Sequence, residues 1–187
     1  DKLMRFTSIF PRRGAYGLML AMLAIMAGLI LWGLWQVRTS FVQANELAGA
    51  EQAVSEALIA VRDRDVGKIS SLLYSRSIVV RQFNYAVRMP RALDRLCRNY
   101  ALDGLSDYDL KRNVRVVPNA SRTLIVNILQ SSVGRGYPAE WLSWEQDRPV
   151  VVEYSVRGKR MISVVLREDG KWKLSALPLC LSANALK

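Results

Sequence analysis

An uncharged, strongly apolar run near the N-terminus dominates the hydropathy pattern of the chain. Residues 14–35 consist mainly of Leu, Met, Ala, Ile, Gly and Trp. At about 1.5 Å per residue, a helix of this length reaches across a hydrocarbon core about 30 Å thick. A core helix of a small soluble domain would have a polar face, and this run has none. The pattern therefore predicts one transmembrane helix over residues 15–36.

A cleaved signal peptide is the main alternative for this run. The apolar region of a signal peptide is usually about 7–15 residues long and is followed by a small-residue cleavage site. Here the run is longer, and the nearest site of that kind, Val42-Gln43-Ala44, lies well beyond it. These observations favour a permanent anchor.

The charges that flank the run predict the orientation of the anchor. Lys2, Arg5, Arg12 and Arg13 precede it, whereas only Arg38 follows it closely. By the positive-inside rule, residues 1–14 are expected in the cytoplasm and the C-terminal part across the membrane. For a bacterial inner membrane this side is the periplasm, where residues 37–47 would form a stalk.

Apolar residues at helical spacing follow the predicted stalk. They indicate one helix up to a charged break at residues 62–65 and a second helix over residues 66–73. Residues 77–89 fit either a strand or a helix. Pro90 disfavours helical geometry at the preceding residue and suits the first position of a new helix, which we expect to end near Gly104.

The C-terminal half has the alternation and the turn residues of β-strands, including a strong hairpin signal at Asp169-Gly170. Strands are expected over residues 112–117, 122–132, 150–156, 160–168 and 171–177. A loop is expected over residues 134–149. Helices followed by strands predict an α+β domain. We place this domain at residues 48–179, followed by a tail at residues 180–187.

Two segments resemble the nuclear-transport-factor-two-like superfamily. AVSEALIAVRDRDVGKISSLL, residues 53–73, is similar to its opening pair of helices, and REDGKWKLSALPL, residues 167–179, is similar to its closing hairpin. The resemblance implies a cone-shaped domain in which helices pack on a curved antiparallel sheet. The superfamily includes enzymes, ligand binders and scaffolds, so the fold alone does not give a function.

A single anchor joined to such a domain resembles the bitopic scaffold subunit of type IV secretion and conjugation machines. RPVVVEYSVRGKRMISVVLRE, residues 148–168, is compatible with the central hairpin of that group. The resemblance implies a non-enzymatic assembly protein that docks other envelope-complex subunits as a homo-oligomer within a larger complex. The alternative is a membrane-tethered periplasmic domain that binds a ligand in the mouth of the cone.

The chain has no histidine, which removes the commonest general base near neutral pH and the commonest metal ligand. Asp103, Asp107, Asp109 and Tyr108 could serve an isomerase of this fold, but Asp in a turn usually makes local hydrogen bonds. The two cysteines are too few for a zinc site. We therefore predict no catalytic residue, no metal and no cofactor.

A stripe of arginines is the first candidate for a binding surface. Spacings of three, four and three place Arg88, Arg91, Arg95 and Arg98 on one helical face. The formal net charge of +11 favours anionic partners: an acidic protein surface, lipid headgroups or nucleic acid. No exposed aromatic residues accompany the stripe, so nucleic acid is not expected. The alternative is a solvated face balanced by Asp94.

An aromatic loop and two cysteines complete the candidate residues. Tyr137, Trp141 and Trp144 lie close together in the expected loop, and exposed residues of this kind are typical of interaction hot spots. Alternatively, the tryptophans fold back to fill the open end of the cone. Cys97 and Cys180 could form a disulfide bond in an oxidising compartment, or they could be small buried apolar residues.

Overall fold

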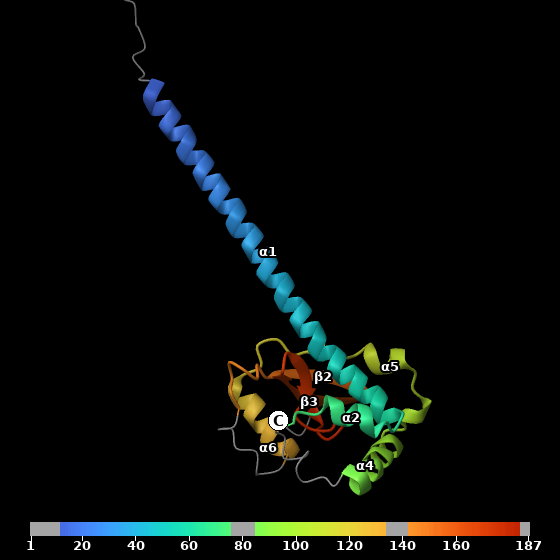
Figure 1. The fold of residues 1–187 in the computed structure, drawn as a ribbon. Helices are drawn as coiled ribbons and strands as arrows, with labels where there is room; N and C mark the ends of the chain where they lie inside the picture. Colours follow the sequence, from blue (N-terminus) through green and yellow to red (C-terminus); the bar gives the residue numbers. More distant parts are fainter. Residues whose placement is uncertain (1–11, 76–84, 134–141, 184–187) are drawn as a thin grey trace, which may run out of the picture. The chain divides into compact units, whose positions relative to one another are not determined.

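The computed structural model describes residues 12–75, 85–133 and 142–183. The chain divides into two compact units, residues 1–45 and residues 46–187, which are described separately. Helix α1 (Arg12–Arg62) begins in the first unit and ends in the second (Figure 1). The expected helix at residues 15–36 and its helical continuation through residues 37–47 are both part of α1.

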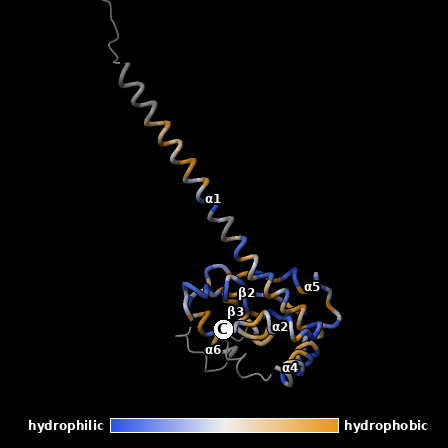
Figure 2. The backbone as a smooth tube through the Cα atoms, in the orientation of Figure 1, coloured by the Kyte–Doolittle hydropathy of each residue, from blue (hydrophilic) through white to orange (hydrophobic). Residues whose placement is uncertain are grey.

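The first unit is the apolar part of α1. Between Ala21 and Arg38 the helix is long and apolar enough to cross a membrane, by length and composition. Its large apolar side chains are exposed in the chain, as at Leu29 (58%) and Trp35 (62%), and Figure 2 shows the apolar positions along this stretch. The membrane crossing itself stays a prediction.

The second unit contains a four-stranded antiparallel sheet in the order β1-β2-β3-β4. The strands are β1 (Arg115–Val116), β2 (Val150–Val156), β3 (Lys159–Glu168) and β4 (Lys171–Leu174). Two-residue turns, Arg157-Gly158 and Asp169-Gly170, join the last three strands, and all four turn residues have positive φ. Turns of this kind match the twist of the strands, so both predicted hairpins are confirmed.

Short helices surround the sheet. They are α2 (Val66–Leu72), α4 (Tyr85–Asn99), the 3₁₀ turn η1 (Leu102–Gly104), α5 (Asp107–Lys111) and α6 (Arg122–Val133). The charged break before α2 is where it was predicted, because the Asp65 carboxylate accepts a hydrogen bond from the Lys68 amide and caps the helix. The α+β class is therefore confirmed.

The expected strand at residues 122–132 is wrong, because this segment is helix α6. Ile125, Ile128 and Leu129 are buried at the spacing of one helical face. The Ser121 hydroxyl accepts a hydrogen bond from the Leu124 amide at the helix start. The β-branched residues of this segment favour a strand locally, but burial of the helical stripe decides its structure.

Several further boundaries differ from the prediction. Helix α4 ends at Asn99 and not near Gly104, and the strand expected over residues 171–177 ends at Leu174. Pro90 lies inside α4 instead of beginning a helix, although a proline removes one helical hydrogen bond. The preceding residue, Met89, is fully buried in the core, which offsets this loss. The strand expected at residues 112–117 is reduced to the two residues of β1. Of the ambiguous segment 77–89, residues 77–84 lie outside the described residues.

The sheet lies between two hydrophobic clusters. On one face, α1, α2, α4 and α5 pack against residues of β2 and β3 that include Val152 and Val165. On the other face, α6 packs against the alternate residues, including Val151 and Val164. The second unit therefore has helices on both faces of its sheet.

Glu46, at the start of the second unit, attaches α1 to the sheet. Its backbone carbonyl accepts a hydrogen bond from the Trp172 indole at 2.9 Å, and its carboxylate pairs with Arg167 at 2.7 Å. Arg148 approaches the other carboxylate oxygen at 3.4 Å. The Trp172 ring lies so close to Gly49 that a Cβ there would be 2.8 Å from a ring carbon. The contact with the Trp172 ring therefore requires glycine at position 49.

This contact predicts different outcomes for two glycine substitutions in helices. Gly49→Ala should displace the Trp172 ring, whereas at Gly67 in α2 the nearest atom would lie at 3.4 Å. Alanine suits a helix better than glycine at both positions, but only Gly49→Ala creates a close contact. We therefore expect the free energy of unfolding of Gly49→Ala to be about 1–3 kcal/mol below that of Gly67→Ala. Denaturant unfolding of the full chain in detergent micelles measures this difference. Equal stabilities would contradict the close packing.

Candidate functional site

Helix α4 separates its apolar and basic residues onto two faces. Met89, Leu93 and Cys97 follow each other at intervals of four and are completely buried in the first core cluster. The opposite face is exposed and carries Arg88, Arg91, Arg95 and Arg98. Since burial of the apolar face fixes the rotation of the helix, it also turns all four predicted arginines outward.

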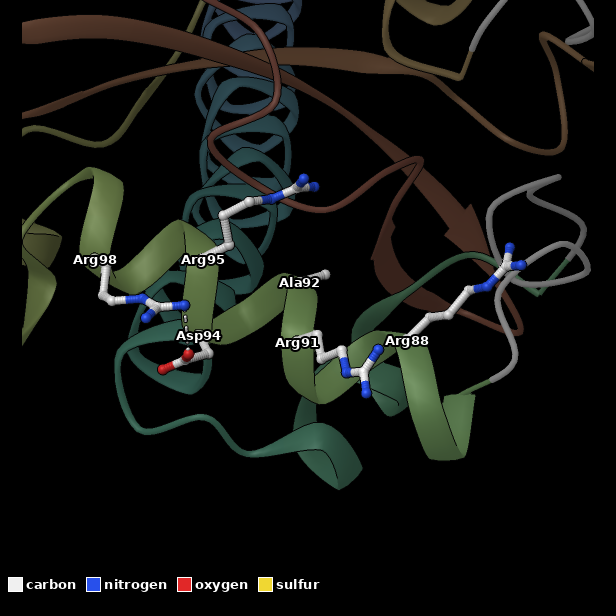
Figure 3. A pocket seen from close by; sticks show the side chains of 6 residues that line it. All are labelled: Arg88, Arg91, Ala92, Asp94, Arg95 and Arg98. Atoms are coloured by element: carbon white, nitrogen blue, oxygen red, sulfur yellow. Dashed lines mark ion pairs between the residues drawn. The ribbon is translucent and has the colours of Figure 1, made fainter.

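The four arginines line one open groove with a volume of about 440 Å³. Ala92 and Asp94 are the other described residues of the lining (Figure 3). The Arg98 side chain is directed toward Asp94, whereas the side chains of Arg88 and Arg95 are directed away from it. The structure thus places all four arginines of the predicted stripe along one groove.

The arginines of the groove differ in their partners. Arg98 forms an ion pair with Asp94 at 2.8 Å, and the other oxygen of the Asp94 carboxylate lies 3.2 Å from the Arg64 guanidinium. Within the described part of the chain, no ion pair joins Arg88, Arg91 or Arg95 to a carboxylate. Asp94 therefore balances only one arginine of the stripe, and the other three have no ion-pair partner among the residues that the structure describes.

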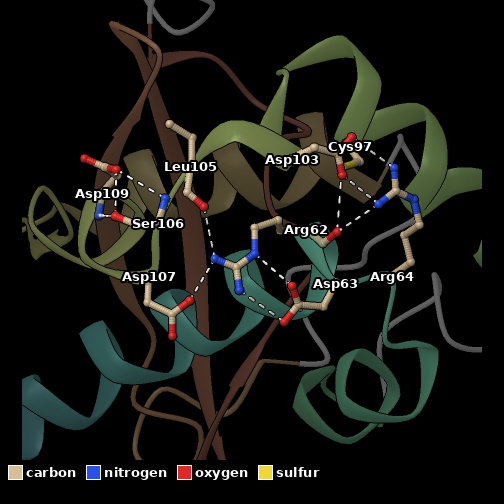
Figure 4. Close-up of polar contacts among 9 residues, drawn as sticks. All are labelled: Arg62, Asp63, Arg64, Cys97, Asp103, Leu105, Ser106, Asp107 and Asp109. Carbon is tan, nitrogen blue, oxygen red and sulfur yellow. Dashed lines mark hydrogen bonds and ion pairs between the residues drawn. The ribbon is translucent and has the colours of Figure 1, made fainter.

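A network at the charged break holds α4 in place (Figure 4). Arg64, which has a φ of 57°, pairs with Asp94 of α4 and makes two hydrogen bonds to Asp103, at 2.8 and 3.2 Å. The Arg64 guanidinium lowers the pKa of the Asp103 carboxyl. The Cys97 thiol donates a hydrogen bond to Asp103 at 3.3 Å. Burial is the main cause that raises the pKa of the thiol, and this hydrogen bond is the second.

The network was not predicted from the sequence. The break at residues 62–65 alternates basic and acidic residues, and further acidic residues follow on α4 and in the DGLSDYD segment. This distribution of charges is the signal that could have indicated the network. Arg62 pairs with Asp107 at 2.7 Å and donates to the Leu105 carbonyl. Asp109 makes the local hydrogen bonds expected of a turn residue, because it caps α5 together with Ser106.

The aromatic candidates are only partly described. Tyr137 and Trp141 lie outside the described residues. Trp144 is half-buried and packs against the second core cluster, and the Arg122 guanidinium lies 5.0 Å from the centre of its ring. These contacts favour the packing alternative for Trp144.

The two cysteines have different surroundings. Both are free thiols in this structure, Cys97 buried and Cys180 exposed, so the disulfide bond, one of the two alternatives, is not formed here. The Cys97 thiol instead contacts Asp103 and the Arg62 carbonyl. Among the described residues, no group of three or more acidic or cysteine side chains could hold a metal ion.

Comparison of the chain with protein-family models, curated proteins and solved structures finds no match.

The Arg64–Asp103 pair predicts a pH-dependent loss in an Asp103→Asn variant. Because the folded-state pKa is lowered from about 3.8, the contribution of the pair is present above that value and is lost as the pH falls through the folded pKa. We expect Asp103→Asn to reduce the denaturant midpoint at neutral pH, with the difference from wild type vanishing in strong acid. Asp169→Asn, on an exposed turn, is the control. A difference independent of pH would contradict the pair.

Packing of Trp144 predicts a loss of stability in Trp144→Ala. We expect the free energy of unfolding to fall by about 1–3 kcal/mol, less than the roughly 3–5 kcal/mol of a fully buried tryptophan. Tyr108→Ala is the control, because Tyr108 is 71% exposed and should change stability by at most about 0.5 kcal/mol. Thermal and denaturant unfolding test both. If Trp144→Ala is as stable as the unchanged chain, the packing interpretation is wrong and Trp144 is again a candidate contact residue.

Proposed function

We propose that the chain is a non-enzymatic inner-membrane assembly protein of a bacterial envelope complex. Its apolar helix crosses the membrane with the N-terminus in the cytoplasm, and its C-terminal unit lies in the periplasm and docks other subunits. The observation that carries the proposal is a groove in which three arginines have no ion-pair partner among the described residues. The groove lies on a folded unit that follows an exposed apolar helix in the sequence.

Charge and exposure support a docking role. A long exposed apolar segment is energetically unfavourable in water and favourable in a bilayer. Uncompensated arginines on one helical face repel each other, and an anionic partner would offset this repulsion. Several copies held in one membrane would present their weak contact surfaces at a high effective concentration. For this reason the proposal includes a homo-oligomer within the larger complex.

The nature of the complex rests on the sequence resemblance. We assign the unit to the cone-shaped nuclear-transport-factor-two-like domains and the complex to a type IV secretion or conjugation machine. The helix pair and the hairpins, which the structure contains, are compatible with this assignment. The alternative of a ligand-binding unit gains little from the space between α6 and β3, where the cavity has a volume of only about 10 Å³. This is about the room that one water molecule needs.

Extraction of the tagged full-length chain from bacterial membranes tests this proposal. We expect the chain to stay in the membrane after an alkaline wash and to retain its apolar segment by intact-mass measurement. In mild detergent, it should migrate as a complex well above its own 21.1 kDa, together with other envelope proteins. A double change, Ile25→Arg with Leu29→Arg, should release the chain, since each central arginine costs about 2.5–3.5 kcal/mol of insertion free energy.

Tyr108→Arg is the matched control, since Tyr108 is equally exposed but lies in the folded unit. It should leave membrane retention unchanged. A lone monomer or dimer, above all one that retains a small molecule, would overturn the assembly function and favour ligand binding. Release of the unchanged chain by the alkaline wash would overturn the anchor.

A further inference from the structure

We infer that Arg88, Arg91 and Arg95 form a docking site for an acidic segment of a partner protein, and that Arg98 is not part of this site. The inference rests on the proposed docking function and specifies the chemistry of the partner. It divides the arginine stripe into three residues that bind and one residue that is occupied within the chain.

The division follows from the ion pairs. Asp94 lies four residues before Arg98 on α4, and the two side chains meet at 2.8 Å. Arg64 approaches the other oxygen of the same carboxylate at 3.2 Å, so both oxygens of Asp94 already contact an arginine outside the proposed site. Arg88, Arg91 and Arg95 have no carboxylate partner in the described part of the chain. No hydrogen bond to another described residue uses the donors of their guanidinium groups.

The spacing of the three arginines indicates the form of the ligand. Residues 88 and 95 are seven positions apart, which corresponds to about 10 Å along a helix. Each guanidinium can bind one carboxylate through two parallel hydrogen bonds. A segment with Asp or Glu at intervals of three and four residues on a helix repeats the same spacing. Such a segment would place one carboxylate at each arginine.

The composition of the groove favours a protein segment over a membrane surface. Segments that lie on membranes combine basic residues with exposed apolar or aromatic side chains that enter the lipid. Among the described residues that line this groove, the only apolar one is Ala92, which is 8% exposed. A hollow of about 440 Å³ can be filled by a chain segment, whereas a flat bilayer contacts the most protruding side chains. The groove therefore fits an acidic peptide better.

Asp94 limits the charge of the groove. Its loss would free Arg98 and weaken the hold on Arg64, so the groove would gain positive charge. Both ion pairs are exposed, and exposed pairs contribute little to stability. Asp94→Asn should therefore bind an acidic segment more tightly while the chain remains folded.

A direct titration tests the inference. The full-length chain in nanodiscs of uncharged phosphatidylcholine is titrated with a fluorescent oligoglutamate peptide at about 0.15 M salt, where charges more than about 8 Å from the peptide are screened. We expect the Kd to rise at least about tenfold in Arg91→Gln/Arg95→Gln, because two charge-assisted contacts are lost. Arg88→Gln should weaken binding in the same direction, and Asp94→Asn should lower the Kd.

Two controls each remove one positive charge outside the three-arginine site, as Arg88→Gln removes one within it. Arg98→Gln removes the paired arginine of the same helix, and Lys171→Gln removes an exposed lysine of β4. Each should change the Kd by less than about threefold, as expected for screened charges outside the site. Circular dichroism of every variant checks that the fold is intact. An equal loss in Arg98→Gln or Lys171→Gln would overturn the inference, because binding would then depend on net charge alone.

A second arm distinguishes the membrane from a protein segment. The same variants are tested for binding to added vesicles that contain phosphatidylglycerol. Vesicle binding that depends on Arg91 and Arg95, without peptide binding that depends on them, would overturn the inference in favour of lipid.

Extraction in mild detergent separates the inference from the proposed function. If the Arg91→Gln/Arg95→Gln variant still assembles into the full complex, the inference fails and the docking function stands. If even the unchanged chain extracts alone, the docking function fails.

Discussion

The packing of the C-terminal part of α1 against the sheet is the constraint on which the rest of the folded unit depends. Ala50, Val54, Ala57, Leu58 and Val61 are completely buried on one face of the sheet. Alanine at two of these five positions, Ala50 and Ala57, lets other elements pack close to the helix axis. At the start of this part, Glu46 and Gly49 attach it to β3 and β4 through Trp172 and Arg167.

This packing also determines how α4 presents its arginines. The break after α1 places Arg64 between Asp94 of α4 and Asp103 beyond it, so the end of α1 and the start of the next segment hold α4 by charge. The buried face of α4 completes the same core cluster, which leaves its basic face in solvent. A polar network and an apolar face thus act together on one helix. The groove is a consequence of both.

The sequence predicted the parts of the fold that local chemistry decides. Asp-Gly and Arg-Gly turns require positive φ, so both hairpins could be located to within a residue or two. Helix α6 could not, because Ile and Val suit a strand locally and only burial against β3 selects the helix. The arginine stripe followed from spacing alone. The arginines that pair with Asp94 could not be predicted. One of them is Arg64, which only the fold brings near α4.

Site-specific photo-cross-linking in living cells is the most direct measurement of what occupies the groove. A photoreactive amino acid at position 98 lies in the groove but leaves Arg88, Arg91 and Arg95 intact. We expect an adduct with a segment rich in Asp and Glu in another envelope protein, located by mass spectrometry, and no such adduct from position 171. Adducts to lipid alone, or to protein segments without acidic residues, would contradict a docking site for an acidic partner.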